Sequence, residues 1–499
     1  MDLQNNLLGI LPAYPDGRTS CGVYNAGGGL YDERVLDEYT LLVEEPTEMD
    51  EDEFRNMIEG FLAEGIPGVR EYSDTFLQAK FVHEKRLQQV VYRDGKASAY
   101  FADEYVPCQE DKSNLLRTVI GTSESAFLSY IESLKEQGFS VLYQNRIEQN
   151  LAFEIEKAGN RYWASYTAGD RTARFAESKT GVSAADFGYT AVCDSRTEIY
   201  QFGLVQKHFM LGTYTDCGMN YAVKLGDNSF FLVDGGQYIQ ATDEVVKKYY
   251  RFLRERAGLK DSEKLRIAGW FCTHAHNDHF ELFVKMLRFY HEEIELERVI
   301  FNFPSPQLVN ISPENWSMMN RINRLYPNVQ YIKPHLGLSF TLADTKFEVL
   351  QTHEDFMAYG CNEIPGDFNN TSTVLKLTFN GKTMLFLGDI SEMGEALLLR
   401  HYTADTLKSD AVQAAHHVFN LFYYLYDVID ADFAFLPTEP ATRTNHDRHK
   451  YERIAMSVPE ENIFFASEDG THGIGVVDGE LRHIYEAPMI GGAYDGSDV

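Results

Sequence analysis

Apolar residues recur at helical spacing twice in the first third of the chain. Each stripe fits one face of a short helix, and a glycine follows each at 65 and 138, where it can end the helix because glycine readily adopts a left-handed conformation. The two stripes consist of Phe54, Met57, Ile58 and Leu62, and of Phe127, Tyr130, Ile131 and Leu134. The pattern therefore predicts two amphipathic helices.

Alternating, aromatic-rich runs follow both predicted helices and end at residues 92–104 and 166–178. Such alternation predicts antiparallel strands. Equivalent positions in the two segments lie about 73 residues apart. We interpret residues 50–105 and 122–178 as a duplicated helix-plus-strands unit within an α+β N-terminal region of residues 1–200. Coincidence between two small α+β segments is the alternative.

Strands and helices alternate from about residue 203 onward, which indicates mixed sheets with helices on their outer faces. Thr242 is expected to cap one helix, a second helix begins near Phe280, and Asn380-Gly381 predicts a type I′ hairpin turn. The predicted strands lie within 220–236, 267–273, 299–303, 373–379, 383–387, 411–415 and 433–437, and a strand and hairpin lie within 461–485.

The segment THAHNDH follows the buried strand at 267–272 and contains His274, His276, Asp278 and His279. Open α/β folds place functional side chains just beyond the carboxyl ends of strands. Neutral imidazole and carboxylate groups suit zinc, iron or manganese. Three imidazoles and a carboxylate within six residues are hard to explain as packing. The segment therefore predicts a metal site, against the alternative of a solvated histidine-rich loop.

A dinuclear site needs ligands from elsewhere in the chain. Asp389 ends the apolar strand at 384–387, where its carboxylate could bridge two metals about 3.5–4 Å apart. The alternative is that Asp389 caps the following helix. His416 and His417 end the strand at 411–415, and either could reach the same site.

Asp234 closes the apolar run FLVDGG, in which two glycines allow close backbone approach. We expect Asp234 to orient a ligand imidazole or the metal-binding loop. A simple turn aspartate is the alternative.

Composition narrows the classes of partner. The 499-residue chain has a net charge of −30, which disfavours nucleic acid and anionic membranes and favours a small-molecule substrate. No apolar run reaches the length of a membrane span, and the N-terminus lacks the basic region of a secretory signal. The six cysteines are scattered, as reduced thiols of a cytoplasmic protein would be. Homo-oligomerisation is left open.

The ordered motifs of residues 203–488 resemble those of the metallo-β-lactamase superfamily. These motifs are FLVDGG, THAHNDHF, LFLGD and AVQAAHH. Residues 369–391 look most similar to the lactamase-like domain of competence-type DNA-uptake proteins and to bacterial phosphorylcholine esterases. The resemblance implies a four-layer αβ/βα sandwich over residues 203–490. It does not cover the first 200 residues.

The resemblance also implies roles for individual residues. The first metal would be held by His274 and His276, and the second by Asp278, His279 and His417. Asp389 would bridge the two metals. His416 would then be free to contact an anionic group of the substrate, although the assignment of His416 as the ligand stays open.

One position departs from the family pattern. The family has a third histidine for the first metal about twenty residues before the bridging aspartate, and this chain has Asn369 and Asn370 there. Asn369 could take that position, although its amide oxygen is a weaker zinc ligand. His353 could reach in instead, or the first metal could be loosely held.

These features predict a hydrolase with two divalent metal ions, zinc first and manganese or iron as alternatives. A water between the metals would become a hydroxide, which Asp278 could help to hold. His416 or His449 could contact an oxyanion or protonate a leaving group, although His449 could equally decorate a nearby helix. The resemblance favours a small-molecule phosphoester. The alternative is a metal-stabilised scaffold whose N-terminal module senses a ligand or binds a protein, with little hydrolytic activity.

Overall fold

The computed structural model describes residues 11–12, 14–15, 18–23, 41–43, 47–48, 50–63, 69–73, 78–83, 86–93, 96–102, 115–178, 182–204, 218–236, 241–303, 322, 325–356, 368–466 and 470–487. The chain forms two compact units. The larger comprises Met1–Gly28, Lys112–Val309 and Asn328–Val499, and the smaller comprises Gly29–Asp111 and Asn310–Pro327. The division at about residue 200 stays a prediction. Cys193 and Cys272 are free thiols, whereas Cys108, Cys217 and Cys361 lie outside the described residues.

The first sheet of the larger unit has the order β20-β19-β17-β16-β15-β14-β28-β29, with β18 beside β17. Its strands are β14 (Glu198–Gln201), β15 (Asn220–Lys224), β16 (Phe230–Asp234), β17 (Leu265–Phe271), β18 (Ile294–Leu296), β19 (Arg298–Ile300), β20 (Gln330–Ile332), β28 (Thr471–Val477) and β29 (Glu480–Ala487). Strands β16, β17, β19 and β20 are parallel, so their carboxyl ends meet at one edge.

The second sheet has the order β13-β21-β22-β23-β24-β25-β26-β27. Its strands are β13 (Tyr189–Thr190), β21 (Ser339–Ala343), β22 (Thr345–Gln351), β23 (Val374–Phe379), β24 (Lys382–Phe386), β25 (Ala411–Gln413), β26 (Phe433–Leu436) and β27 (Ile463–Phe465). Asn380 and Gly381 join β23 to β24 with φ angles of 47° and 79°. Both angles are positive, as the predicted type I′ turn requires.

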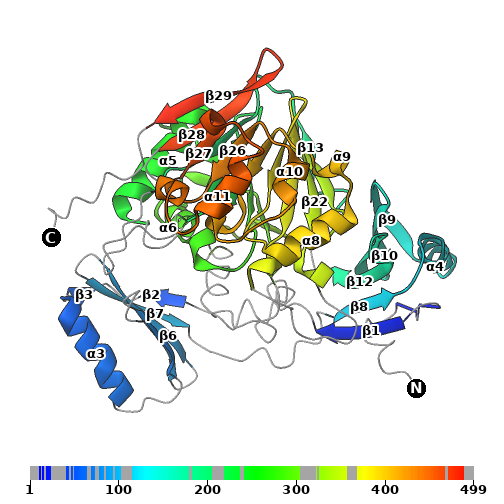
Figure 1. Ribbon diagram of the computed structural model, residues 1–499. Helices are drawn as coiled ribbons and strands as arrows, with labels where there is room; N and C mark the ends of the chain where they lie inside the picture. The colour runs from blue at the N-terminus through cyan, green and yellow to red at the C-terminus, as the bar shows by residue number, and fades with distance from the viewer. Residues whose placement is uncertain are drawn as a thin grey trace. The chain divides into compact units, whose positions relative to one another are not determined.

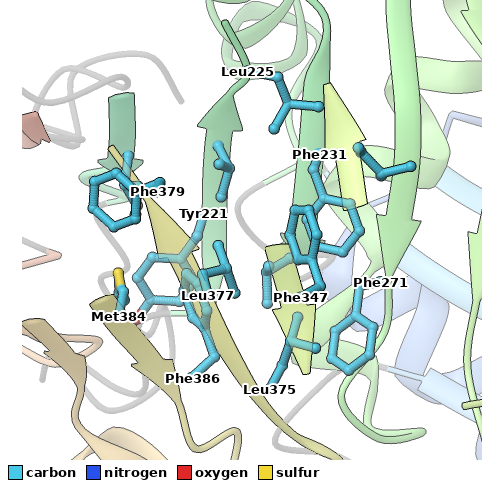
Figure 2. Packing of buried hydrophobic residues seen from close by; sticks show 14 of the residues in the cluster. Tyr221, Leu225, Phe231, Phe271, Phe347, Leu375, Leu377, Phe379, Met384 and Phe386 are labelled. Carbon is cyan, nitrogen blue, oxygen red and sulfur yellow. The ribbon is translucent and has the colours of Figure 1, made fainter. Parts of the chain in front are cut away.

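The two sheets pack face to face through a core rich in aromatic side chains (Figure 2). The ring centroids of Phe231 on β16 and Phe347 on β22 are 4.2 Å apart, and those of Tyr221 on β15 and Phe386 on β24 are 5.3 Å apart. Strand β16 is buried along its whole length, as expected for a strand covered on both faces.

Helices cover the outer face of each sheet (Figure 1). Phe283 of α6 packs against Trp270 of the first sheet, and Leu385 of the second sheet belongs to a core with Leu398 of α8 and Ile454 of α11. The helices are α5 (Asp243–Ala257), α6 (Glu281–Phe289), α8 (Glu392–His401), α9 (Ala404–Leu407), α10 (Leu425–Ile429) and α11 (Arg448–Ala455). The expected four-layer αβ/βα sandwich is therefore confirmed.

A third sheet in the larger unit has the order β1-β8-β12-β11-β10-β9. Its strands are β1 (Arg18–Val23), β8 (Leu115–Ile120), β9 (Ser140–Ile147), β10 (Asn150–Lys157), β11 (Asn160–Thr167) and β12 (Thr172–Ser178). Helix α4 (Glu124–Glu136) covers it, and all four residues of the predicted stripe from Phe127 to Leu134 are buried.

The third sheet packs directly against the sandwich. Trp163 of β11 belongs to the core between the two sandwich sheets, and its indole N–H donates to the carbonyl of Leu336 over 3.1 Å. In the turn between β11 and β12, the carboxylate of Asp170 lies 2.7 Å from Nε2 of His401, the last residue of α8. The third sheet and the sandwich therefore share both a core and a polar contact.

The described part of the smaller unit includes helix α3 and one antiparallel sheet. These elements are β2 (Leu41–Val43), β3 (Thr47–Glu48), α3 (Glu51–Ala63), β4 (Val69–Ser73), β5 (Gln78–His83), β6 (Arg86–Arg93) and β7 (Lys96–Ala102). The strand order β2-β7-β6-β5-β4 corresponds to the order β8-β12-β11-β10-β9 in the third sheet. In both segments a helix comes before four consecutive strands of the chain, which are β4–β7 after α3 and β9–β12 after α4. Duplication itself stays a prediction. None of the helices described in either unit is long and apolar enough to cross a membrane.

Candidate metal centre

The THAHNDH segment leaves the carboxyl end of β17 and enters the one-turn helix η3 (Asn277–His279). Its first residue, Thr273, donates its backbone N–H to Asp234 Oδ1 over 2.8 Å and accepts the N–H of Thr373 over 2.9 Å. The loop is therefore tied to both sandwich sheets. These hydrogen bonds fix the backbone position from which the side chains of the following histidines extend.

Asp389 follows β24 at the same end of the sandwich. The backbone N–H groups of Leu387 and Gly388 donate to Gln413 Oε1, each over 2.8 Å, and the N–H of Asp389 donates to Ser372 Oγ over 2.9 Å. Gly388 has a φ of 57°, and a Cβ there would lie 2.9 Å from the Cβ of Ser372. Glycine is therefore required immediately before the aspartate. Ser391 precedes α8 as its N-cap residue, so Asp389 does not cap that helix.

His416 and His417 lie in the turn η6 (Ala415–Val418), where both have left-handed backbone angles, with φ of 46° and 50°. The turn is held by the N–H of His416, which donates to the carbonyl of Gly388 over 3.1 Å. His417 Nδ1 donates to the carbonyl of Pro437 over 2.9 Å. That bond directs His417 Nε2 toward the carboxylates of the site.

Four side chains meet in the first of two groups that could hold a metal ion: Asp278, His279, Asp389 and His417. Nε2 of His417 lies 3.0 Å from Asp278 Oδ2 and 3.5 Å from Asp389 Oδ2. Nε2 of His279 lies 3.2 Å from Asp389 Oδ2. All four donor atoms lie within 4.8 Å of one another.

The second group consists of His274, His276 and Asp389. His274 Nε2 lies 2.9 Å from His276 Nδ1 and 3.9 Å from Asp389 Oδ2. Asp389 belongs to both groups, and its Oδ2 is the atom that each of them approaches. Apart from Asn369, the residues expected as ligands of the two metals are thus brought together in two groups, and their roles as ligands stay predictions.

The donors of both groups fit divalent metal ions. Two nitrogens bound to one tetrahedral zinc at about 2.0–2.1 Å lie roughly 3.3 Å apart, close to the separation of the donor nitrogens of His274 and His276. Asp389 Oδ1 is buried and has no hydrogen-bond partner among the described residues, as a bridging carboxylate awaiting a ligand would be. Imidazole and carboxylate are also the donor types that zinc, manganese and iron accept.

The charges of the site favour cations. Burial opposes a positive charge on His279 and His417, yet the neighbouring carboxylates, with Asp389 foremost, hold the pKa of both imidazoles well above their usual range. Burial likewise opposes ionisation of Asp389, yet His279 and His417 hold its pKa well below the usual range. The pocket therefore stabilises positive charge next to ionised carboxylates.

Asp234 lies behind the first group, fully buried, with a φ of 58°. Its Oδ2 accepts a hydrogen bond from Nδ1 of His279 over 2.8 Å, which leaves Nε2 of that ring to face Asp389. This is the contact expected of a residue that orients a ligand imidazole.

The remaining predicted residues lie outside both groups. His416 Nε2 is 3.1 Å from Asn369 Nδ2, so these two side chains face each other. His353 is fully buried in η4 (His353–Phe356) and is in neither group. His449 is exposed on α11, where its Nδ1 lies 3.2 Å from the carbonyl of His446. Metal-binding or catalytic roles for these residues stay predictions.

Besides Asp234, further residues position the centre that sequence reasoning missed. Thr273 Oγ1 donates to Asp234 Oδ2 over 3.0 Å and lies 3.1 Å from His274 Nδ1. Asn370 Oδ1 accepts from the N–H of Ser391 over 3.0 Å, next to the strand end that carries Asp389. The threonine directly before the first histidine could have been suspected, because a hydroxyl there can reach a ligand imidazole. Asn370 and Gln413 carry no comparable local signal.

No protein-family model and no curated protein matches the sequence. Several solved structures match in part. A metal-dependent hydrolase of the β-lactamase superfamily is 10% identical over 55% of this chain and 98% of its own, with a TM-score of 0.31. A metallo-β-lactamase from Cronobacter sakazakii is 17% identical over 35% of this chain and 55% of its own, with a TM-score of 0.20. A diiron β-hydroxylase from Streptomyces venezuelae is 11% identical over 57% of this chain and 55% of its own, with a TM-score of 0.29. The chemistry of this chain therefore rests on its own residues.

Proposed function

We propose that this chain is a metal-dependent hydrolase of the metallo-β-lactamase type that cleaves an ester of a small molecule at a two-metal centre. One observation carries the proposal: Asp389 is shared by two groups of potential ligands, and its Oδ2 lies between 3.2 and 3.9 Å from the nearest nitrogens of His279, His417 and His274. A carboxylate in that position suits two cations side by side.

His274, His276 and Asp389 would hold one metal, and Asp278, His279, Asp389 and His417 the other. Zinc is the first choice because imidazole and carboxylate donors dominate both sets. We assign Asn369 to the first metal, at the position where the resemblance expects a histidine. With that weaker ligand, the first metal would be held less tightly than the second.

Two such metals, when bound, lower the pKa of a water to near neutrality and polarise the oxygen of the scissile group. Around them, the protein supplies positioning. Asp234 holds the His279 ring, and the carbonyl of Pro437 holds the His417 ring. The Asp278 side chain is 18% exposed, so its carboxylate can also accept a hydrogen bond from the attacking water. His416 lies beside His417, with its Nδ1 against Asn420 Oδ1 and its Nε2 against Asn369 Nδ2. An anionic oxygen of the substrate would displace the Asn369 amide and accept a hydrogen bond from Nε2 of the protonated His416 ring.

We place the substrate among phosphoesters of small molecules. The net charge of −30 opposes approach to polyanions such as nucleic acid. A compact ester can still enter, because the charge of the bound metals locally outweighs the carboxylates that hold them.

Metal analysis combined with hydrolysis of bis-p-nitrophenyl phosphate tests the proposal. Two metals per chain and turnover are expected for the natural protein, and turnover should fall at least a hundredfold in Asp278→Ala. Asp261→Ala, which alters an exposed loop aspartate, is the control and should retain both properties. One tightly bound metal with no turnover of any ester would overturn the hydrolase and favour a metal-stabilised scaffold. The asparagine at position 369, where the resemblance expects a histidine, makes the scaffold the relevant competitor.

A further inference from the structure

Residues 419–424, which we call the aromatic segment, expose three rings to solvent. Phe419 is 38% exposed, Tyr423 is 55% exposed and Tyr424 is 67% exposed. Among the described residues, Phe289 provides the only other exposed aromatic ring of this class. Large apolar rings gathered at one place on a protein surface usually mark a binding surface.

Hydrogen bonds from α8 hold the backbone that carries the exposed tyrosine rings. The carboxylate of Glu395 on α8 is 5% exposed, and its Oε1 accepts the backbone N–H groups of Tyr423, Tyr424 and Leu425 over 2.7–2.9 Å. Phe422, between the exposed rings, is buried in the core under α8 and α10. The segment is therefore anchored from below, and its rings point outward from a fixed base.

The aromatic segment is continuous with the metal centre. The backbone N–H of Phe419 donates to the carbonyl of His416 over 2.7 Å. The Phe419 ring centroid lies 5.5 Å from that of His416 and 5.8 Å from that of His417. Phe419 is thus a partly exposed apolar wall in direct contact with an imidazole of the ligand group.

Apart from the hydroxyls of Tyr423 and Tyr424, polar groups along the segment are engaged within the protein. Asn420 Nδ2 donates to the carboxylate of Glu392 over 3.2 Å, and the N–H of Leu421 donates to the same carboxylate over 3.3 Å. Arg453 donates to the carbonyls of Phe422 and Tyr423 and pairs with Asp427. The segment therefore offers a visiting molecule mainly the faces and edges of its rings.

We propose that Phe419 determines specificity at the metal centre and that the substrate is an ester with an aromatic or other apolar substituent next to the scissile bond. This inference rests on the proposed hydrolase. The apolar substituent packs on Phe419 while the ester oxygens face the metals. Removing such a substituent from water supplies binding free energy that a methyl group in its place does not.

Binding and turnover are measured with matched probes that differ only in the substituent. Calorimetry on the metal-loaded protein compares phenylphosphonate with methylphosphonate, and kinetics compare the p-nitrophenyl esters of the same two phosphonates. We expect the phenyl member to be favoured about tenfold in both assays. Phe419→Ala should abolish the preference, chiefly through KM, whereas Phe419→Leu should keep most of it. Metal content should stay unchanged in both variants.

Phe289→Ala removes the exposed ring on α6 and is the matched control, which should keep the full preference. Equal binding of the two phosphonates by the natural protein, or a preference that survives Phe419→Ala, would overturn the inference. If the protein binds phenylphosphonate selectively but turns over neither ester, the proposed hydrolase activity is contradicted and the apolar binding site at Phe419 is still supported. If Phe419→Ala or Tyr424→Ala converts an oligomer to a monomer without changing the preference, the segment serves a second copy of the chain and the inference fails.

Discussion

Asp234 accepts a hydrogen bond from Nδ1 of His279 over 2.8 Å, and this contact turns the opposite ring nitrogen of His279 toward Asp389. Both side chains are fully buried, so no water competes for the bond. Asp234 thereby sets the tautomer and the orientation of one of the proposed ligand imidazoles. The same carboxylate also accepts the N–H of Thr273, so it orders the start of the metal-binding loop.

Asp234→Asn should therefore weaken metal binding without emptying the site at once. The amide still fills the space but lacks the charge that fixes Nδ1–H on His279. Loss of such a partner typically lowers metal affinity by about 10–100-fold. Competition with a chromophoric chelator measures the affinity, and Asp261→Asn in an exposed loop serves as the control. An affinity equal to that of the natural protein would contradict the role assigned to Asp234.

Replacing each histidine of η6 separately should give different results. His417→Ala removes an imidazole that lies 3.0 Å from Asp278 and 3.5 Å from Asp389, so one metal per chain should be lost together with activity. His416→Ala should retain both metals and lower kcat by about 10²–10³-fold, the range typical for loss of one hydrogen-bond donor to an oxyanion. Metal content by mass spectrometry separates the two variants. The reverse pattern would make His416 the ligand.

Gly388→Ala should disturb the strand end that carries Asp389. A Cβ at this position would meet the Cβ atoms of Ser372 at 2.9 Å and Thr273 at 3.0 Å, and φ is 57°. We expect a loss of about 2–4 kcal/mol in the free energy of unfolding, from crowding and from the left-handed backbone together. Gly381→Ala is the matched control, because its φ is 79° but nothing lies within 4 Å of the added carbon. Urea titration should show a clearly smaller loss there, of about 1 kcal/mol. Equal losses would show that the space around residue 388 can relax.

The contact between Asp170 of the third sheet and α8 should make the free energy of unfolding decrease at acidic pH. Burial opposes ionisation of Asp170, yet His401, Arg174 and Arg400 hold its carboxyl pKa below the usual range. A lowered folded-state pKa contributes stability that is complete above the unfolded value near 3.9 and is lost as pH falls through the folded value.

The measurement compares the midpoint of thermal unfolding for the natural protein and Asp170→Asn between pH 7 and pH 3. The variant should be less stable by about 3 kcal/mol at pH 7, and the gap should narrow as the pH falls below 4. Asp405→Asn, an exposed aspartate on α9, should follow the natural protein throughout. A gap that does not change with pH would show that the charge of Asp170 contributes nothing.

Local sequence patterns predicted many of the helices and strands and named residues that the structure brings together in two groups. The stripe from Phe127 to Leu134 became α4 with all four side chains buried, and Thr242 caps α5 through a bond to the N–H of Val245. The residues that follow strands β17 and β24 came together because these strands belong to two sheets that pack face to face, with both strand ends at the same end of the sandwich. Strand ends are visible in a sequence, because apolar runs stop where polar residues begin.

Other features depend on contacts between distant segments and could not be foreseen. Nothing around Trp163 signals that it joins the core of the sandwich, because its burial is set by residues such as Leu336, more than 170 positions later. The left-handed angles of His416 and His417 also escape prediction, since histidine has no strong preference for them. The side chain of Asn369 faces His416, a pairing that spacing alone does not show.

Helix α8 joins the metal centre to the third sheet. It begins three residues after Asp389 and ends at His401, which lies 2.7 Å from the carboxylate of Asp170. Ten helical residues span about 15 Å, so α8 rigidly connects the metal centre with the third sheet. A gene fragment starting near residue 203 would lack Asp170, so His401 at the end of α8 would lose its carboxylate partner. It would also lack Trp163 and would expose the part of the sandwich core that Trp163 covers. The chain therefore has to be expressed with residues 115–178 for the metal centre to be studied in its intact form.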